Sequence, residues 1–304
     1  MHRCPGRSLA PHGGRTMTAP PAADRYLCIC ADDFGMSEGI NAAVLRLAER
    51  GKLSATSCMV GRDAWEAGRK ALRDIPPAAL DVGLHLDLTP IPAGGTSEPG
   101  LGALILKSRL GRLDPEGLRT QIRRQLTRFE DGMGRPPAFV DGHRHVHQFA
   151  VVREVLTEEI ASRYTGAKPW MRNTAPPAPR RFPWTKADLV FALGGARFIE
   201  AAARRGIPVS SGLLGVYPFD DRAGGYAERL RRWIAECRTG DVLMCHPSLE
   251  DESSTVPHAA ARRKEYEALD SMVYPVQTGA GAVFLSPLSR LLPQAPRTPG
   301  QSPG

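Results

Sequence analysis

The chain has 304 residues, of which 42% are hydrophobic and 24% are charged, a composition typical of a globular protein with a sizeable buried core. Its formal net charge is +8, but the first 25 residues carry +3 and the last 19 carry +2, which leaves +3 for the rest of the chain. Because this excess is weak and no apolar run approaches the ~20 residues of a transmembrane helix, we expect neither a nucleic-acid partner nor a membrane partner.

The two ends of the chain are rich in proline, glycine and small polar residues. Segments of this composition cannot bury enough apolar surface to become ordered. We therefore predict a disordered leader over residues 1–25, a single folded domain over 26–285 and a disordered tail over 286–304.

The six cysteines do not suggest a disulfide framework in a chain of this length. Four of them lie inside or at the end of apolar runs, and the Cys28–Cys30 spacing lacks the second pair that a closed zinc site needs. We interpret Cys28, Cys30, Cys58 and Cys245 as core residues of a reduced, cytoplasmic protein.

The first part of the folded region alternates between short apolar runs, typical of buried parallel strands, and patterns with a helical period. Strands are expected over residues 26–31, 54–60 and 80–88, and helices over 38–50 and 63–74. Ser37 is a suitable N-cap for the first helix, and Gly51 is a suitable glycine at its C-terminal end. Residues 90–112 are rich in glycine and proline and interrupt the alternation.

The alternation resumes at residue 115. Helices are expected over 115–133, 148–162, 187–204, 222–236 and 258–270, and strand-like runs over 138–147, 169–173, 207–211 and 240–247. About seven such units in one chain predict an α/β fold with a closed or nearly closed (β/α) barrel, because crossovers between parallel strands are almost always right-handed. An open doubly wound sheet is the alternative.

Residues that can bind a metal gather at the C-terminal ends of the predicted strands, where (β/α) barrels place their active sites. They are Asp32 and Asp33, then His85, then Asp141, His143, His145 and His147, and finally His246. Each alone has an ordinary explanation, since His85 suits a hydrogen-bonded core position and paired aspartates suit a helix N-terminus. Two histidines and one carboxylate with open positions, however, are a known way to hold a catalytic divalent ion.

Four segments carry a resemblance to a known family: ADDFGMSEGINAAV, VGLHLDLT, DGHRHVHQF and VLMCHP. In order and spacing they resemble the signature segments of the YdjC-type carbohydrate deacetylases, the family of chitooligosaccharide deacetylase, over about residues 26–285. The resemblance implies a distorted single-domain (β/α) barrel with about seven strands. It also implies a hydrolase that uses one divalent metal, Mg²⁺ with Zn²⁺ as the alternative, to remove an N-acetyl group from an amino sugar or a chitooligosaccharide and release acetate.

The resemblance also assigns roles to single residues. It places Asp33, His85 and His143 on the metal and makes Asp32 the general base, which would take a proton from water. His246 matches the histidine of the family's late CHP segment. We expect it to act as a general acid in its imidazolium form, or to contact the substrate.

Three further residues are expected to support these. Asp141 and His145 would orient His143, because metal-bound imidazoles usually donate their second ring N–H to a partner. Arg172, in the segment WMRN, is a candidate substrate-binding residue, with a surface arginine as the alternative.

The chain departs from the family pattern in two places. Arg144 stands where the family often has a histidine, and residues 90–112 do not resemble any one member closely. We expect this region to lie beside the mouth of the pocket, where it would affect the choice of sugar.

Other activities stay open as alternatives. A metal-dependent phosphoesterase would use the same ligands, although a second bridging metal needs further carboxylates. A sugar-binding barrel without activity could lose Asp32 and His246, which are both present. No nucleophile elbow, Walker loop or dinucleotide fingerprint appears in the sequence. The expected partner is an acetylated carbohydrate substrate, and a homodimer is compatible with the sequence.

Overall fold

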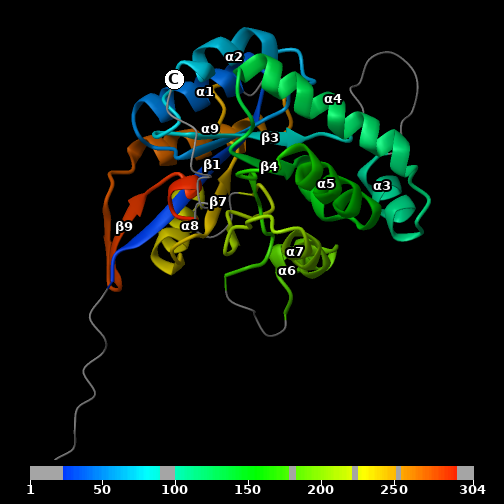
Figure 1. The fold of residues 1–304 in the computed structure, drawn as a ribbon. Coiled ribbons are helices and arrows are strands. Elements are labelled where there is room, and N and C mark those ends of the chain that lie inside the picture. Colours follow the sequence, from blue (N-terminus) through cyan, green and yellow to red (C-terminus); the bar gives the residue numbers. More distant parts are fainter. Residues whose placement is uncertain (1–22, 90–99, 178–182, 221–224, 251–254, 293–304) are drawn as a thin grey trace, which may run out of the picture.

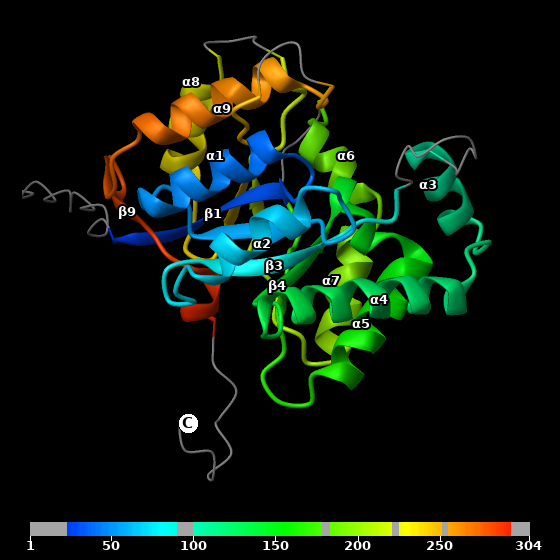
Figure 2. The same ribbon diagram turned by 90° about the horizontal axis from the view of Figure 1, so that it is seen from above.

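The computed structural model describes residues 23–89, 100–177, 183–220, 225–250 and 255–292. A parallel sheet runs through its centre (Figure 1). Its strands lie in the order β5 (Trp170–Met171), β4 (Phe139–Gly142), β3 (Asp81–Leu86), β2 (Ala55–Cys58), β1 (Arg25–Phe34), β7 (Val242–Cys245) and β6 (Leu213–Leu214). The helices surround this sheet (Figure 2).

The helices follow the strands in the order expected of a (β/α) barrel. They are α1 (Glu38–Glu49), α2 (Trp65–Arg73), α3 (Leu101–Arg109), α4 (Pro115–Met133), α5 (Ala150–Arg163), α6 (Lys186–Ala192), α7 (Gly195–Arg204), α8 (Gly225–Glu236) and α9 (Ala259–Ser271), with 3₁₀ turns at His143–Gln148 and Leu288–Arg290. Among the described residues, no helix is both long enough and apolar enough to cross a membrane.

The edge strands β5 and β6 are joined through residues that precede β6. Met171 and Val209 form a parallel bridge. The N–H of Met171 donates to the carbonyl of Pro208 at 2.8 Å, and the N–H of Leu213 donates to the carbonyl of Ala175 at 2.8 Å. The sheet therefore curves into a distorted barrel, which confirms the predicted fold class.

Local sequence accounts for the strongest elements. The central part of β1 is buried on both faces, with Leu27 to Ala31 all 0% exposed, as its continuous apolar run predicts. Ser37 caps α1 by accepting a hydrogen bond from the backbone N–H of Ile40 at 3.2 Å. Helix α4 has the N-cap Asp114, a proline in its first turn and a left-handed glycine, Gly134, at its end.

Several boundaries differ from the sequence-based expectation. The helix expected over 187–204 is two helices, α6 and α7, because the chain turns at Gly194 with a φ of 144° that favours glycine. Strand β6 begins two residues after the expected run 207–211. A helix, α3, lies within the Gly- and Pro-rich region, of which residues 90–99 are outside the described residues.

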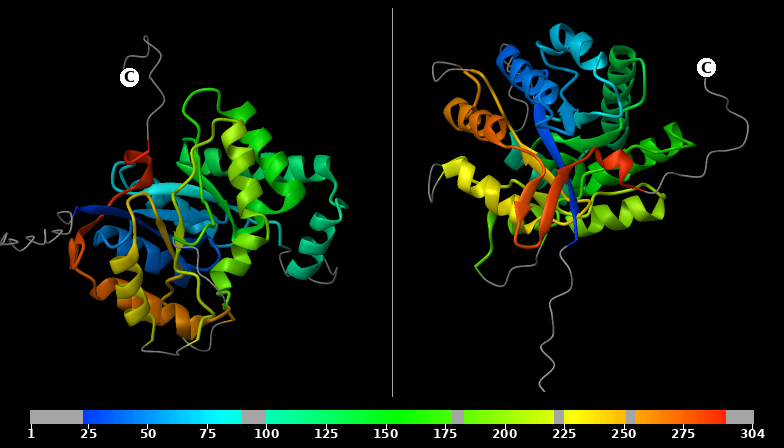
Figure 3. Two further views of the ribbon diagram at one scale, coloured as in Figure 1. Left: turned by 90° about the horizontal axis from the view of Figure 1, so that it is seen from below. Right: turned by 90° about the vertical axis from the view of Figure 1, so that its left-hand side faces the viewer.

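The C-terminal part of the fold extends beyond the predicted boundary at residue 285. Strands β8 (Val276–Thr278) and β9 (Gly281–Leu285) form a hairpin, and β9 adds to the start of β1 in parallel (Figure 3). Leu288 is fully buried, and Ser289 donates through its backbone N–H to Asp81 at 2.9 Å. Residues 286–292 therefore pack on the barrel and are not a tail, since Leu288 supplies apolar surface to the core.

The cysteines in the described residues are buried and free, as expected for core positions. They are Cys28, Cys30, Cys58, Cys237 and Cys245. Burial raises the pKa of the Cys28 thiol to about 12, so that this thiol stays protonated at neutral pH.

Candidate metal centre and catalytic pocket

The paired aspartates at the end of β1 reach one site because the strand turns between them. Asp33 has a φ of 68°, a left-handed conformation that is uncommon for a residue other than glycine. In a regular strand the two side chains would point to opposite faces of the sheet. The turn brings both carboxylates to the C-terminal end of the barrel, where each is 1% exposed.

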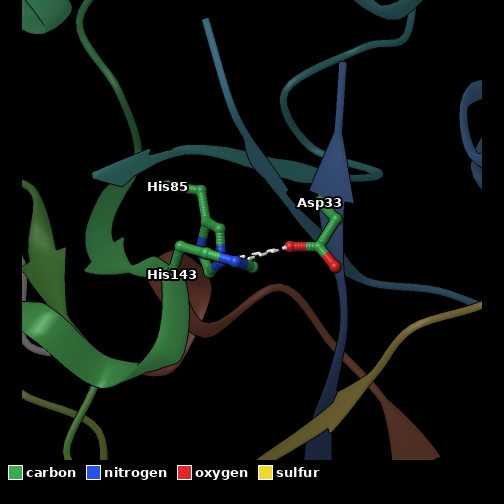
Figure 4. Close-up of side chains that lie close together, drawn as sticks. All are labelled: Asp33, His85 and His143. Carbon is green, nitrogen blue, oxygen red and sulfur yellow. Dashed lines mark hydrogen bonds and ion pairs between the residues drawn. The ribbon is translucent and has the colours of Figure 1, made fainter. Parts of the chain in front are cut away.

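Three residues converge on a candidate metal centre (Figure 4). Oδ1 of Asp33 lies 3.0 Å from Nδ1 of His143 and 3.5 Å from Nε2 of His85. The three donor atoms lie within 4.8 Å of one another, a spacing that suits one ion with ligand distances of about 2.0–2.2 Å. The residues therefore fit a divalent metal ion held by two imidazoles and one carboxylate.

His85 is oriented by a buried carboxylate. Its Nδ1 lies 2.6 Å from Oδ1 of Asp141, and the hydroxyl of Ser57 lies 2.9 Å from the same nitrogen and donates to Asp141. Burial lowers the pKa of His85, but the carboxylates Asp141 and Asp32 outweigh it and raise this pKa to about 10. Burial would raise the pKa of Asp141, yet Arg172 and His85 hold it below its usual range. Asp141 is thus an ionised acceptor that turns Nε2 of His85 towards Asp33.

The prediction for the partners of His143 is wrong in part. Asp141 hydrogen-bonds to His85 and not to His143, because β3 and β4 pair with His85 opposite Asp141. His145 lines the pocket in a left-handed conformation, and burial lowers its pKa well below the usual range. In the described part of the chain, Nδ1 of His145 is buried without a hydrogen-bond partner, so no contact supports the expected orientation of His143 by His145.

Arg172 holds Asp32, the aspartate of the pair that is not part of the candidate metal centre. Its Nη1 donates to Oδ2 of Asp32 at 2.7 Å and its Nη2 donates to Oδ1 at 2.6 Å, a bidentate pair. The same guanidinium pairs with Asp141 and lies 3.1 Å from the sulfur of Cys30. Arg172 is only 1% exposed, so the expectation that it binds substrate is wrong: the guanidinium lies beneath the pocket, against the carboxylates.

This guanidinium also occupies a second cluster of ligand atoms. Cys30, Asp32 and Asp141 bring their donor atoms within 4.8 Å of one another. Arg172 contacts all three. A fixed side-chain cation therefore stands where a second metal ion would otherwise find acidic ligands.

His246, at the end of β7, completes the pocket on the other side of Asp32. Its Nε2 lies 4.0 Å from Oδ2 of Asp32, and its ring packs edge to face with that of Phe219, with the ring centroids 5.2 Å apart. Burial lowers the pKa of His246 to about 4. His246 is therefore neutral at pH 7 in the resting protein, and it becomes an imidazolium only by taking up a proton during a reaction.

Two residues of α9 belong to the site although sequence reasoning missed them. Arg262 donates through Nη2 to Oδ2 of Asp33 at 2.5 Å. Glu265 accepts from the backbone N–H of His246 at 2.5 Å and from the hydroxyl of Tyr217 at 2.6 Å, and burial raises the pKa of Glu265 to about 7. Arg262 and Glu265 are three residues apart, so both lie on one face of α9. This spacing was the feature of the sequence from which their shared position could have been predicted.

The pocket above these residues has a volume of about 460 Å³, within the range of small-molecule sites. Its wall is apolar in part, with Leu101 from the region expected beside the mouth and Phe219 stacked on His258 at 4.5 Å. Lys186 and Arg144 also line it. The pocket therefore combines a candidate metal centre, a carboxylate and a histidine with an apolar platform and basic groups.

Known proteins resemble this chain in sequence and in fold. A chitooligosaccharide deacetylase of Enterobacter sp. (strain 638) is 32% identical over 145 residues, which are 45% of this chain and 56% of that protein. The enzyme of the same name from Citrobacter koseri is 33% identical over 146 residues, 46% of this chain and 57% of that protein. The match thus spans little more than half the length of these relatives.

Similarity in structure extends further along the chain. A protein from Enterococcus faecalis V583, provisionally named a cellobiose-phosphate cleavage protein, aligns with a TM-score of 0.57 at 21% identity, over 82% of this chain and 92% of that one. It shares the fold. The family model described as YdjC-like protein matches residues 26–274, which is most of the folded region, and the chain therefore belongs to the YdjC-like family.

Proposed function

We propose that this protein is a metal-dependent deacetylase that hydrolyses the N-acetyl group of an amino sugar or a chitooligosaccharide-like carbohydrate and releases acetate. One observation carries this proposal. The carboxylate of Asp32, held by Arg172, lines the same pocket as a candidate metal-binding triad. The triad consists of Asp33, His85 and His143. The deacetylase names of the matched relatives support the same reaction.

We assign a role to each residue from its contacts. A bound divalent ion would make water easier to deprotonate and would polarise the acetamide carbonyl. Asp32 accepts the proton of the attacking water, and the bidentate contact with Arg172 keeps both of its oxygens in place. As the C–O bond forms and the C–N bond breaks, the amine nitrogen must gain a proton.

His246 is the group that we assign to that proton transfer. It is neutral at rest because burial lowers its pKa, so it cannot donate as an imidazolium before the reaction begins. Its Nε2 lies 4.0 Å from Oδ2 of Asp32. The proton taken up by Asp32 can therefore pass through His246 to the leaving amine, with Glu265 holding the backbone of His246.

The choice of metal is part of the proposal. Two imidazoles among three ligands suit Zn²⁺ better than Mg²⁺, which prefers oxygen ligands and water. We therefore propose Zn²⁺ as the ion that supports the highest turnover, with Mg²⁺ as the alternative.

The cellular setting is a separate part of the proposal. The buried, free cysteines of the described residues support a reducing, cytoplasmic setting.

The phosphoesterase alternative is less well supported. Two-metal phosphoesterases hold both the attacking and the leaving oxygen between two ions about 3.5–4 Å apart. Here the guanidinium of Arg172 contacts all members of the second acidic cluster. A single-ion hydrolase fits this arrangement better.

Release of acetate from N,N′-diacetylchitobiose and longer chitooligosaccharides tests the function. After chelation we expect no acetate, and we expect release to return with a divalent ion, most strongly with Zn²⁺. Hydrolysis of p-nitrophenyl phosphate is measured in parallel. Phosphate release without acetate release, from folded protein loaded with each ion, would exclude the deacetylase proposal in favour of a phosphoesterase.

The metal centre is tested by removing its ligands one at a time. Asp33→Ala, His85→Ala and His143→Ala should each weaken Zn²⁺ binding by more than ~100-fold, because changes to the partners of ligands alone cost ~10–100-fold. Activity should be lost together with binding. Isothermal titration measures the affinity, with Asp63→Ala as a control because Asp63 is exposed outside the pocket. If one of these three variants binds Zn²⁺ as tightly as the native protein, the replaced residue is not a ligand of the metal.

A further inference from the structure

The two carboxylate oxygens of Asp33 face different partners. Oδ1 lies towards the imidazoles, 3.0 Å from Nδ1 of His143 and 3.5 Å from Nε2 of His85. Oδ2 accepts a hydrogen bond from Nη2 of Arg262 at 2.5 Å. One oxygen is thus directed into the candidate metal centre, and the other is engaged by a cation.

Arg262 is held firmly in this position. It is 4% exposed, and its Nε donates to the carbonyl of Pro257 at 3.0 Å. Its backbone carbonyl accepts from the N–H of Ser248 at 3.2 Å, which ties the start of α9 to the loop after β7. Because both backbone and side chain are anchored, the guanidinium cannot easily leave Oδ2 when an ion binds at Oδ1.

We propose that Arg262 is a positioning residue that confines Asp33 to one ligand oxygen, so that the metal keeps an open position for water and substrate. The inference rests on the metal centre of the proposed function and adds a constraint on its coordination. A carboxylate can bind an ion through one oxygen or both, and a catalytic site needs a free position. A charge-assisted hydrogen bond to Oδ2 favours the one-oxygen mode.

The constraint predicts an unusual combination of effects. Hydrogen-bonding partners usually strengthen metal binding by orienting the ligand. Arg262 is a cation, however, so it also repels a divalent ion and withholds Oδ2 from it. Removing it should therefore tighten binding and, at the same time, slow turnover, because a second oxygen from Asp33 fills the open position.

The first test compares Arg262→Met with the native protein, each stripped of metal and titrated with Zn²⁺. We expect the variant to bind Zn²⁺ about tenfold more tightly, and its kcat for acetate release at saturating Zn²⁺ to fall by about tenfold or more. Arg262→Lys, which keeps the charge, should show a smaller gain in affinity. Arg263→Met is the matched control, because Arg263 is the next residue of α9 and its exposed side chain pairs with Glu267.

Weaker Zn²⁺ binding together with lower activity in Arg262→Met would overturn the proposal, because a merely structural support loses both. Unchanged affinity would overturn it as well. If that variant does not fold, a crystal structure of the native protein with Zn²⁺ decides the matter. One oxygen of Asp33 within about 2.2 Å of the ion supports the proposal, and two overturn it.

These outcomes are separable from failure of the proposed function. Native protein that binds no Zn²⁺ or Mg²⁺ after chelation and reloading would remove the metal centre itself. Tight binding that becomes tighter in Arg262→Met, without acetate release from any substrate, would keep the inference and reject the deacetylase activity.

Discussion

Replacing Asp32 with asparagine is expected to lower kcat for acetate release by about 10²- to 10⁴-fold, the usual contribution of a general base. An amide cannot accept the proton of the attacking water. The fold should survive, because Arg172 keeps an ionised partner in Asp141. Zn²⁺ affinity should stay within about tenfold of native, since the Asp32 carboxylate is bonded to Arg172 and not to the triad.

The measurement pairs steady-state acetate release with isothermal titration of Zn²⁺ on the same preparation. Asp63→Asn is the matched control, because it makes the same change at an exposed position outside the pocket. Native turnover in Asp32→Asn would show that another group takes the proton. Loss of Zn²⁺ binding would instead make Asp32 a ligand of the metal.

Replacing Arg172 with methionine is expected to destabilise the protein by about 3–5 kcal/mol, because removal of one partner leaves buried charges uncompensated. The guanidinium is 1% exposed and pairs with two carboxylates, Asp32 and Asp141, that are each 1% exposed or less. At about 2–4 °C per kcal/mol for a domain of this size, the Tm should fall by roughly 10 °C. Turnover should also fall, since Asp32 loses its bidentate anchor.

Urea denaturation gives the free energy of unfolding, and acetate release is measured well below the lowered Tm. Arg172→Lys separates the two roles of the residue: it should recover much of the stability through its charge, but little of the turnover, because an ammonium cannot form the bidentate pair. Arg231→Met on α8, where the side chain is exposed, is the control. If Arg172→Met has the same midpoint of urea denaturation as the native protein, the argument from buried charge is refuted.

Much of the site was predictable because parallel strands end at a common edge. Asp33, His85 and His143 lie at the ends of three different strands, and the pattern of short apolar runs predicts that residues at these ends lie close together. The choice of these three among the strand-end residues came from the resemblance to the YdjC-type deacetylases. The order of the strands was not needed for that prediction. Local signals such as the Ser37 cap were also sufficient, because they act over a few residues.

Contacts between segments far apart in the sequence were harder to predict. Arg262 and Glu265 lie in a charged helical pattern that resembles a solvated face, and nothing nearby in sequence marks their buried partners. The sequence around Arg172 does not show that this side chain is buried, because its burial depends on Asp32, a partner 140 residues away. The β8–β9 hairpin was missed because its strands are short and only partly buried.

The sequence alone was therefore sufficient for the α/β fold class, the chain order of most elements and the gathering of metal-binding residue types at the strand ends, because periodicity and strand-end placement are local properties. Packing decided the rest. It set which carboxylate pairs with which cation, and burial in a low-dielectric interior made His246 neutral at pH 7. These features depend on distances between side chains from different strands and helices, which arise when the barrel curves.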